Sequence, residues 1–453
     1  MKDMTAGSPG KVIFHFAISL MLGNIFQQMY TFVDTMIVGR YLGTGALAAL
    51  GAVEWLIFIM FGCTQGMTHG FSICIAHRFG SRAVYELKKD ITHSFYLCLC
   101  LTALLTASGL WLGIPILRLL KTPKEIMEPA FSYLRILFAG SFASVIYNFL
   151  AGILRAAGDG RAPLWAVTIG SLCNIGLDLV FVILFQWGIE GAACATVISW
   201  LVSALYCLAA FSKMELAKPD KESWRPEVSR LGRILLLGLP AGFQNVITGA
   251  GGVIVQSVVN GFGILFIAGF TAANRLYGLL ETAAASYGYA MASYTGQNMG
   301  ARLPGRIRKG LKEAVLLGLG TACLMSFVML FFGKRILGCF LAGKEQAAVA
   351  AGYEFLVVLS FFFPLLYLLY IVRSCVQGMG DTFFPMISSV IQLVMRMACA
   401  LLLVGVMGYR GVFFGEAAAW IGADLLLLIV FRHRIRNLEE SVGGIRSKQN
   451  SIF

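Results

Sequence analysis

Twelve long apolar stretches, separated by short polar segments, dominate this sequence. A helix that crosses a bilayer needs about 20 predominantly apolar residues, and each stretch is long enough. We place the spans at residues 12–38, 46–75, 91–114, 127–156, 164–186, 190–211, 231–258, 266–296, 310–333, 348–376, 385–407 and 411–431. Charged residues make up 13% of the chain, about half the share found in a soluble domain. The sequence therefore predicts an all-α polytopic membrane protein with twelve transmembrane helices.

The two halves of the chain repeat one another. Residues 154–163 and 376–385 share a Gly-Asp-x₃-Pro pattern at an offset of 222 positions. Residues 79–82 and 299–302 match at an offset of 220. A repeat of this length is a duplicated half-protein rather than a solenoid unit. In a membrane chain it is typical of a transporter whose site lies between or within two pseudosymmetric lobes.

The longest polar segment between spans, residues 212–230, separates the two repeats. We interpret it as a linker between an N-terminal six-helix lobe, residues 1–211, and a C-terminal six-helix lobe, residues 231–453. The tails and even-numbered connections hold 24 Lys and Arg, and the odd-numbered connections hold 8. The positive-inside rule then places both termini and the linker in the cytoplasm. We expect a multi-pass protein of the cell inner (plasma) membrane, with both lobes in the same orientation.

The net charge of +13 does not indicate a nucleic-acid partner. The basic residues lie mostly in short loops at helix ends, where they set the topology and meet anionic lipid. The eleven cysteines lie mainly in apolar segments without metal-binding spacing, which is typical of small core side chains. No HExxH, HxxxxD or Gly-x-Ser-x-Gly pattern predicts an enzyme. We expect a monomer with no cofactor, whose partners are the lipid bilayer, a small-molecule substrate and a coupling ion.

Two short acidic side chains lie deep inside predicted spans of the first lobe. Asp34 lies roughly 33 Å and Asp178 roughly 21 Å from the start of its span, at about 1.5 Å per residue. Asn174 precedes Asp178 by one turn on the same helix face, and Thr196 and Tyr133 each lie six residues into their spans from the outer side. Carboxylate, amide and hydroxyl oxygens suit a small hard cation, and the carboxylates can equally hold a proton. The alternative is a hydrogen-bonded cluster that only packs helices.

The second lobe carries a different polar set. Asn274, Tyr277 and Glu281 share one helix face at positions i, i+3 and i+7, and Tyr287 and Met291 continue along the helix. Aromatic and methionine side chains near polar groups can hold a flat lipophilic cation by stacking and cation–π contact. These five residues are therefore candidates for substrate binding.

Arg396 lies near the middle of its predicted span and could neutralise Glu281 or Asp424. Arg396 could belong to a structural ion pair or to a substrate site, and the sequence does not decide between the two. Other ionisable residues lie near the ends of predicted spans, where long side chains reach the headgroups at little cost. They are Glu54, Arg135, Glu354, Arg373 and Glu416.

The chain resembles the MATE family, the multidrug and toxic compound extrusion transporters, from Phe26 to about Trp420. The motifs are Phe-Gln-Gln with Val-Asp-x₃-Val-Gly (26–39), Leu-Arg-x₂-Gly-Asp (154–159), Asn-x₃-Asp (174–178), Gly-Ala-Ala-x-Ala-Thr (191–196), Leu-Pro-Ala-Gly (239–242) and Gly-Gln-Asn-x-Gly-Ala (296–301). The resemblance implies two bundles that form a V, alternating access, and export of organic cations or amphipathic drugs and toxins. It also implies antiport driven by Na⁺ or H⁺.

The resemblance also implies where the coupling ion binds. In the DinF-like prokaryotic branch the cation site lies in the first lobe. Its residues here would be Asp34, Asn174, Asp178 and Thr196, which would also be the Na⁺ ligands, with Tyr133 and Asn148 as outer members. The NorM-like branch uses acidic residues of the second lobe, but the seventh predicted span carries no acid. The first span also lacks the proline that family members often carry there, with Ser19 near the expected place.

A flippase for lipid-linked saccharides, from the same wider superfamily, is the alternative function. Such a protein needs a strongly basic cavity, and the four arginines inside predicted spans scarcely supply one. Sodium and protons can use the same carboxylates, so the sequence leaves both coupling ions open.

Overall fold

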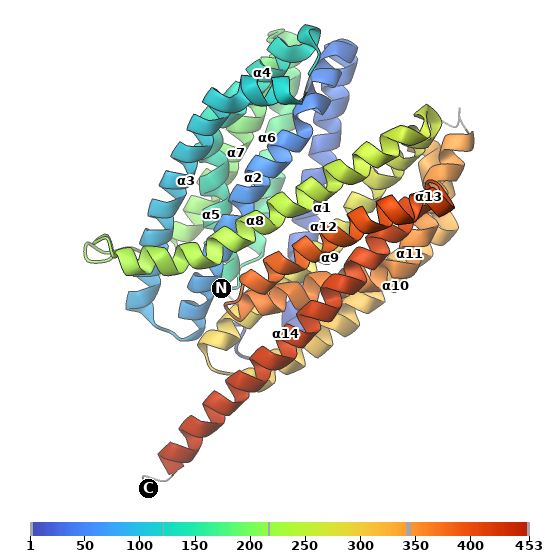
Figure 1. The fold of residues 1–453 in the computed structure, drawn as a ribbon. Helices are drawn as coiled ribbons and strands as arrows, with labels where there is room; N and C mark the ends of the chain where they lie inside the picture. The colour runs from blue at the N-terminus through green and yellow to red at the C-terminus, as the bar shows by residue number, and fades with distance from the viewer. Residues whose placement is uncertain (1–2, 121, 216–217, 341–345, 451–453) are drawn as a thin grey trace. The chain divides into compact units, whose positions relative to one another are not determined.

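The computed structural model of the chain describes residues 3–120, 122–215, 218–340 and 346–450, and these ranges contain helices and connecting turns but no strand. The helical elements, shown in Figure 1, are α1 (Pro9–Tyr41), α2 (Gly43–Gly80), α3 (Val84–Leu119), α4 (Lys124–Ala139), α5 (Ser141–Ala156), α6 (Arg161–Asp178), η1 (Leu179–Leu184), α7 (Gly188–Ser212), α8 (Val228–Val259), η3 (Asn260–Phe262), α9 (Ile264–Gly300), α10 (Pro304–Phe340), α11 (Gln346–Gly378), α12 (Phe383–Leu402), α13 (Val404–Met407) and α14 (Arg410–Asn450).

Twelve helical segments stand at the positions of the twelve predicted spans, which confirms the predicted all-α polytopic class. Within the described residues, ten helices are long and apolar enough to cross a membrane, and α4 with α5 counts as an eleventh if the bent pair forms one span. The remaining segment, α9, coincides with the predicted span 266–296. Asn274, Arg275 and Glu281 lie inside α9 and lower its hydropathy.

The chain divides into two compact units. The first holds Ser19–Asn245 together with the N-terminal residues up to Asp3, and the second holds Met4–Ile18 and the chain from Val246 onward. In the first unit α7 packs against α4, α5 and α6. In the second unit α11 packs against α9, α10 and α14, as expected for a helix that is apolar on all sides. The two units divide at Asn245, after the predicted linker at residues 212–230. The assignment of that linker as the boundary between the two repeated lobes stays a prediction.

The repeated Gly-Asp pair builds the same turn in both halves. Gly158 and Gly380 have φ angles of 78° and 89°, in the left-handed region that favours glycine at a helix C-terminus. Asp159 Oδ1 accepts hydrogen bonds from the backbone N–H groups two and three residues later, and Asp381 Oδ1 does the same. Each aspartate therefore satisfies the free donors at the start of the next helix.

The predicted span 127–156 is broken near its middle. The chain bends by 48° between α4 and α5, at Gly140. A Cβ atom at Gly140 would lie 2.4 Å from Val197 Cγ1, so the close packing of α7 requires glycine there. Thr106 Oγ1 donates to the Phe138 carbonyl at 2.9 Å and lies 2.8 Å from Ser141 Oγ. These bonds satisfy polar groups at the break, as a membrane interior requires.

Glycines in α2 let its backbone lie directly against the first part of α8. A Cβ atom at Gly66 would lie 2.2 Å from the Ala241 carbonyl oxygen, and one at Gly70 would lie 2.5 Å from the Leu237 oxygen. Small residues four positions apart permit such close approach of membrane helices. This contact holds the start of α8 in the first unit.

Replacing Gly66 by alanine should therefore destabilise the first unit. The added methyl group overlaps backbone atoms of α8, and overpacking of this kind costs about 1–3 kcal/mol. The measurement is the midpoint of thermal unfolding in detergent. Gly51→Ala in the same helix is the control, because a Cβ there meets no atom within 4 Å. Equal shifts of the midpoint for both variants would contradict the packing argument.

Candidate functional site

The structure gathers the predicted first-lobe residues around the two acids. Asp34 comes from α1 and Asp178 ends α6, and their carboxyl groups lie within interaction range of each other. The Tyr133 hydroxyl, from α4, interacts with the Thr196 side chain of α7 and lies near both acids. Asn174 lies one turn before Asp178 on the same face of α6. Four helices of the first unit thus supply one polar cluster.

The cluster is buried, and several polar atoms of Asp34, Asp178 and Asn174 in it lack hydrogen-bond partners within the described residues. Asp34 is 9% exposed, and Asp178 and Asn174 are completely buried. Among the described residues, Asp34 Oδ1, both Asp178 oxygens, and the Asn174 Oδ1 and Nδ2 atoms have no hydrogen-bond partner. Burial of unpartnered polar groups is costly, and that of an unpaired carboxylate more so. A small cation held by oxygen ligands, or a proton shared by the two carboxyls, fits this donor set.

Apolar side chains surround the acids. Ile37 and Val38 of α1, Leu137 of α4 and Val182 of η1 belong to one buried cluster that also includes Tyr133. Such surroundings exclude water and strengthen electrostatic interactions between the groups inside. These surroundings therefore oppose ionisation of both acids at the same time.

Two aromatic residues that the sequence motifs did not predict also lie at the site. Tyr30 lies one turn before Asp34 and interacts with Asp34 and with the Trp200 side chain. Trp200 lies one turn after Thr196 and its ring centroid is 5.1 Å from that of Phe61. Both residues follow the i, i+4 rule for side chains on one helix face, which is the signal that points to them.

A change of helix type immediately after Asp178 was also not predicted. The α-helix ends at Asp178 and a π-helix follows over Leu179–Leu184, with the Phe185 N–H bonded to the Val180 carbonyl at 2.8 Å. Gln186 then adopts a φ of 54°, which is uncommon for a residue other than glycine. π-helical turns are rare and frequently occur at functional sites.

Asn148 is in a different environment. It is half-buried in α5, and its Nδ2 donates to the Ser144 carbonyl of the same helix at 2.9 Å. Its neighbours Val145 and Phe149 belong to an apolar cluster separate from the one around the acids. Its assignment as an outer member of the site stays a prediction.

In the second unit, Tyr277 and Glu281 lie together. Glu281 Oε1 accepts a hydrogen bond of 2.8 Å from the Tyr370 hydroxyl of α11, and Tyr277 also interacts with the Glu281 side chain. The Tyr277 ring lies nearly parallel to Phe363 and Trp420, with centroids 6.5 and 6.3 Å away. This group places an acid beside buried aromatic rings, and its assignment to substrate binding stays a prediction.

The other three candidates of the second lobe have different surroundings. Asn274 is exposed. Tyr287 is buried, with its hydroxyl 3.0 Å from Thr321 Oγ1 and its ring 6.2 Å from that of Tyr367. Met291 is fully buried. The structure therefore brings together only part of the predicted substrate set.

Arg396 pairs directly with Glu416, at 2.8 Å from Nη2 to Oε2, rather than with Glu281 or Asp424. The expectation that Glu416 and Arg373 reach the headgroups is wrong. The Glu416 side chain is 13% exposed and forms this ion pair, and Arg373 is 5% exposed beside the Tyr370 ring. Position near the end of a span did not reveal that neighbouring helices cover these groups.

In the described residues, helices stand at all twelve predicted spans, in two halves that repeat in sequence and with ionisable side chains buried among them. This arrangement is typical of a membrane transporter. The family model MatE matches residues 19–180 and 240–402, one region in each half. The chain belongs to the MATE family.

Known relatives align over nearly the whole chain. A probable multidrug resistance protein of Bacillus subtilis, YpnP, is 28% identical and aligns with 95% of this chain and 96% of its own length. Another from the same organism, YoeA, is 26% identical over 83% of this chain and 82% of its own. The crystal structure of a MATE protein in complex with MaL6 superposes with a TM-score of 0.90 at 27% identity, covering 97% of this chain and 99% of that one.

Proposed function

We propose that this protein exports organic cations or other amphipathic drugs and toxins by alternating access, as a monomer driven by inward flow of Na⁺ or H⁺. The observation that carries the proposal is the buried Asp34–Asp178 pair, in which Asp34 Oδ1 and both Asp178 oxygens lack hydrogen-bond partners within the described protein. The names of the relatives, probable multidrug resistance proteins, support the class of substrate.

The acid pair is the proposed coupling element. Two carboxylates in one apolar environment disfavour double ionisation, so the pair holds one proton or one cation. For Na⁺, the ligands would be Asp34, Asp178, Asn174 and Thr196, with the Tyr133 hydroxyl beside them. An ion shifts a conformational equilibrium only through its different affinity for the two states. Binding and release of the ion therefore favour different states of the first unit.

Replacing Glu281 by glutamine should change substrate preference more than ion dependence. The side chain accepts a hydrogen bond from Tyr370 and lies beside Tyr277, so the neutral amide reduces attraction for a cationic substrate. The measurement is the rate of export for a cationic and for an uncharged substrate, each at several ion gradients. If Glu281→Gln removed the dependence of export on the coupling ion but spared binding of the drug substrate, the roles assigned to the two lobes would be reversed.

The linker and both termini should face the cytoplasm of the inner membrane. In a cysteine-free background, a cysteine at Lys221, which is exposed, should react with a membrane-impermeant maleimide only after the cells are opened. A cysteine at Arg118, which is also exposed and lies in the third connection, should react in intact cells. Labelling of the linker from outside would reject this topology, which follows from the charge distribution.

Transport into proteoliposomes, with the sodium and pH gradients imposed separately, tests the function as a whole. Export of an organic cation that depends on one of the two gradients is the expected result. Movement of a lipid-linked saccharide without dependence on either gradient would instead support the flippase alternative.

A further inference from the structure

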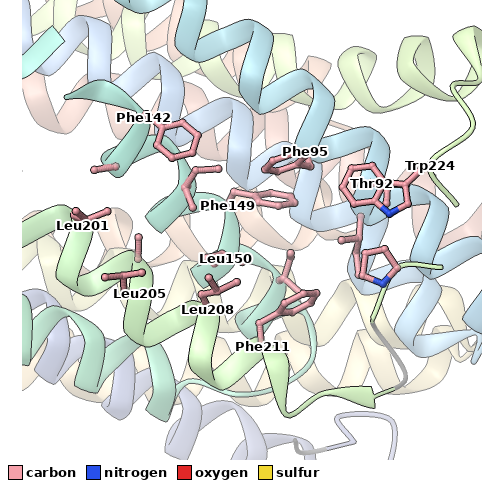
Figure 2. A pocket seen from close by; sticks show the side chains of 16 residues that line it. Thr92, Phe95, Phe142, Phe149, Leu150, Leu201, Leu205, Leu208, Phe211 and Trp224 are labelled. Atoms are coloured by element: carbon pink, nitrogen blue, oxygen red, sulfur yellow. The ribbon is translucent and has the colours of Figure 1, made fainter. Parts of the chain in front are cut away.

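An apolar groove runs along the surface of the first unit, away from the acid pair. Its cavity volume is about 350 Å³ and side chains of α3, α5 and α7 line it, with Pro219 and Trp224 of the linker at one end. Figure 2 shows Leu201, Leu205 and Leu208 along α7, opposite Phe142 and Phe149 of α5. The leucines that edge the groove are between 44% and 55% exposed. In a membrane these faces meet hydrocarbon.

The groove has the depth of one leaflet. Along α7 its lining extends from Leu201 to Phe211, and ten residues at about 1.5 Å each span roughly 15 Å. Half of a hydrocarbon core of about 30 Å is also roughly 15 Å. Because α7 ends at Ser212, next to the linker, the groove occupies the leaflet on the linker side. The topology proposed above makes this the cytoplasmic leaflet.

Ring contacts and hydrogen bonds hold the linker against α3 at one end of the groove. Trp224 stacks edge-on against Phe95 and Tyr96, with ring centroids 6.0 and 5.8 Å away, and its carbonyl accepts a hydrogen bond of 2.8 Å from the Tyr96 hydroxyl. Thr92 Oγ1 donates to the Ser223 carbonyl at 2.6 Å. A tryptophan held at this level is typical of the membrane interface.

Cationic side chains lie beyond this end. Lys221 and Arg225 of the linker are exposed and flank Trp224 in sequence. Their charge complements a phosphate group at the headgroup level. The groove is therefore apolar along the depth of one leaflet. Two exposed cations follow at its linker end, where the neighbouring acids Asp220 and Glu222 are bonded to Lys88 and Tyr85.

We propose that this groove binds a phospholipid of the cytoplasmic leaflet, with one acyl chain between α5 and α7 under Trp224 and the phosphate near Lys221 and Arg225. This lipid site is distinct from the acid pair, since α5 carries its groove-facing side chains in a separate apolar cluster. A lipid seated there stabilises the docked position of the linker.

The test uses the full-length protein in liposomes that contain a phosphatidylglycerol with a photoactivatable group in one acyl chain. After illumination, mass spectrometry maps the labelled peptides. We expect several-fold more label on the groove segments of α5 and α7 than on the exposed face of α10. Leu205→Trp, which fills the groove, should lower that label several-fold. Leu324→Trp is the matched control, because Leu324 is similarly exposed, at 59% against 55%.

Uniform labelling of all lipid-facing helices would overturn the proposal, because it would show that bulk lipid contacts the protein without preference for the groove. Groove labelling unchanged by Leu205→Trp would do the same. If Leu205→Trp is not monodisperse after purification, Leu201→Trp replaces it in the same comparison. Excess unlabelled phosphatidylglycerol should displace the label, whereas equal displacement by oleic acid would overturn the assignment to a phospholipid. The label does not depend on transport, so it is independent of the proposed export function.

Discussion

Asp34→Asn and Asp178→Asn should each abolish gradient-driven export while leaving a folded protein. Each change keeps the size of the side chain but removes the charge that holds the coupling ion, and the two acids act as one unit. Loss of either therefore removes the ability of an ion gradient to bias the two states. Asn174→Ala and Thr196→Ala remove neutral ligands only, so we expect about tenfold weaker cation affinity, or about 1.4 kcal/mol.

The measurement is substrate transport in proteoliposomes as a function of the imposed gradient, with gel filtration as the check on folding. Glu190→Gln is the control, because Glu190 is an exposed acid of the same unit whose side chain is 50% accessible. It should transport like the wild type. A well-folded Asp178→Asn protein that exports drug at the wild-type rate with unchanged ion dependence would rule out this mechanism.

Arg230→Met should cause the largest loss of stability. The Arg230 side chain is 5% exposed and bonds to Asp90, Glu86 and Glu227 at 2.6, 2.8 and 2.9 Å. Loss of one partner of a buried ion pair costs about 3–5 kcal/mol. Glu86 keeps Arg78 and Glu227 keeps Lys89, so the loss falls mainly on Asp90, whose side chain is as buried as that of Arg230. Asp90 keeps only Arg78, at 2.8 Å. The expected result is a clearly lower midpoint of thermal unfolding and a linker that proteases cut more readily.

Arg308→Met is the matched control for this change. Arg308 pairs with Glu439 at 3.1 Å, but their side chains are 60% and 35% exposed. Exposed pairs contribute about 0–1 kcal/mol, so the midpoint should hardly move. Equal destabilisation by both variants would show that burial of the Arg230 network does not matter.

Acid should weaken the same region of the linker. The hydrogen bonds from the Lys89 ammonium and then from the Arg230 guanidinium lower the pKa of Glu227 from its usual 4.5 to about 2. A carboxylate whose pKa is lower in the folded protein stabilises the fold fully when the pH is above the pKa of the unfolded state. This stabilisation is lost as the pH falls through the pKa of the folded state. The Glu227 contacts are therefore complete above pH 4.5 and are lost as the pH approaches 2.

The membrane architecture of this protein follows from its sequence alone. The bilayer interior offers the backbone no hydrogen-bond partner, so long apolar stretches must become helices, and their number and positions are readable directly. The local turns are also encoded locally. Gly158 with Asp159, and Gly380 with Asp381, adopt one conformation because a glycine permits positive φ and an aspartate caps the following helix. Depth along a span likewise pointed to Asp34 and Asp178 as candidate site residues.

Only the tertiary structure decided which groups meet. Position along a helix gives the distance of a side chain from the membrane surface, but it does not say which neighbouring helix the side chain faces. For this reason the sequence did not reveal that Arg396 pairs with Glu416 or that Arg373 is covered. The π-helix after Asp178 was likewise not readable, since no hydropathy pattern encodes one extra residue in a turn. The proposed lipid groove is a product of packing, because three helices and the linker must come together before its apolar faces enclose a space.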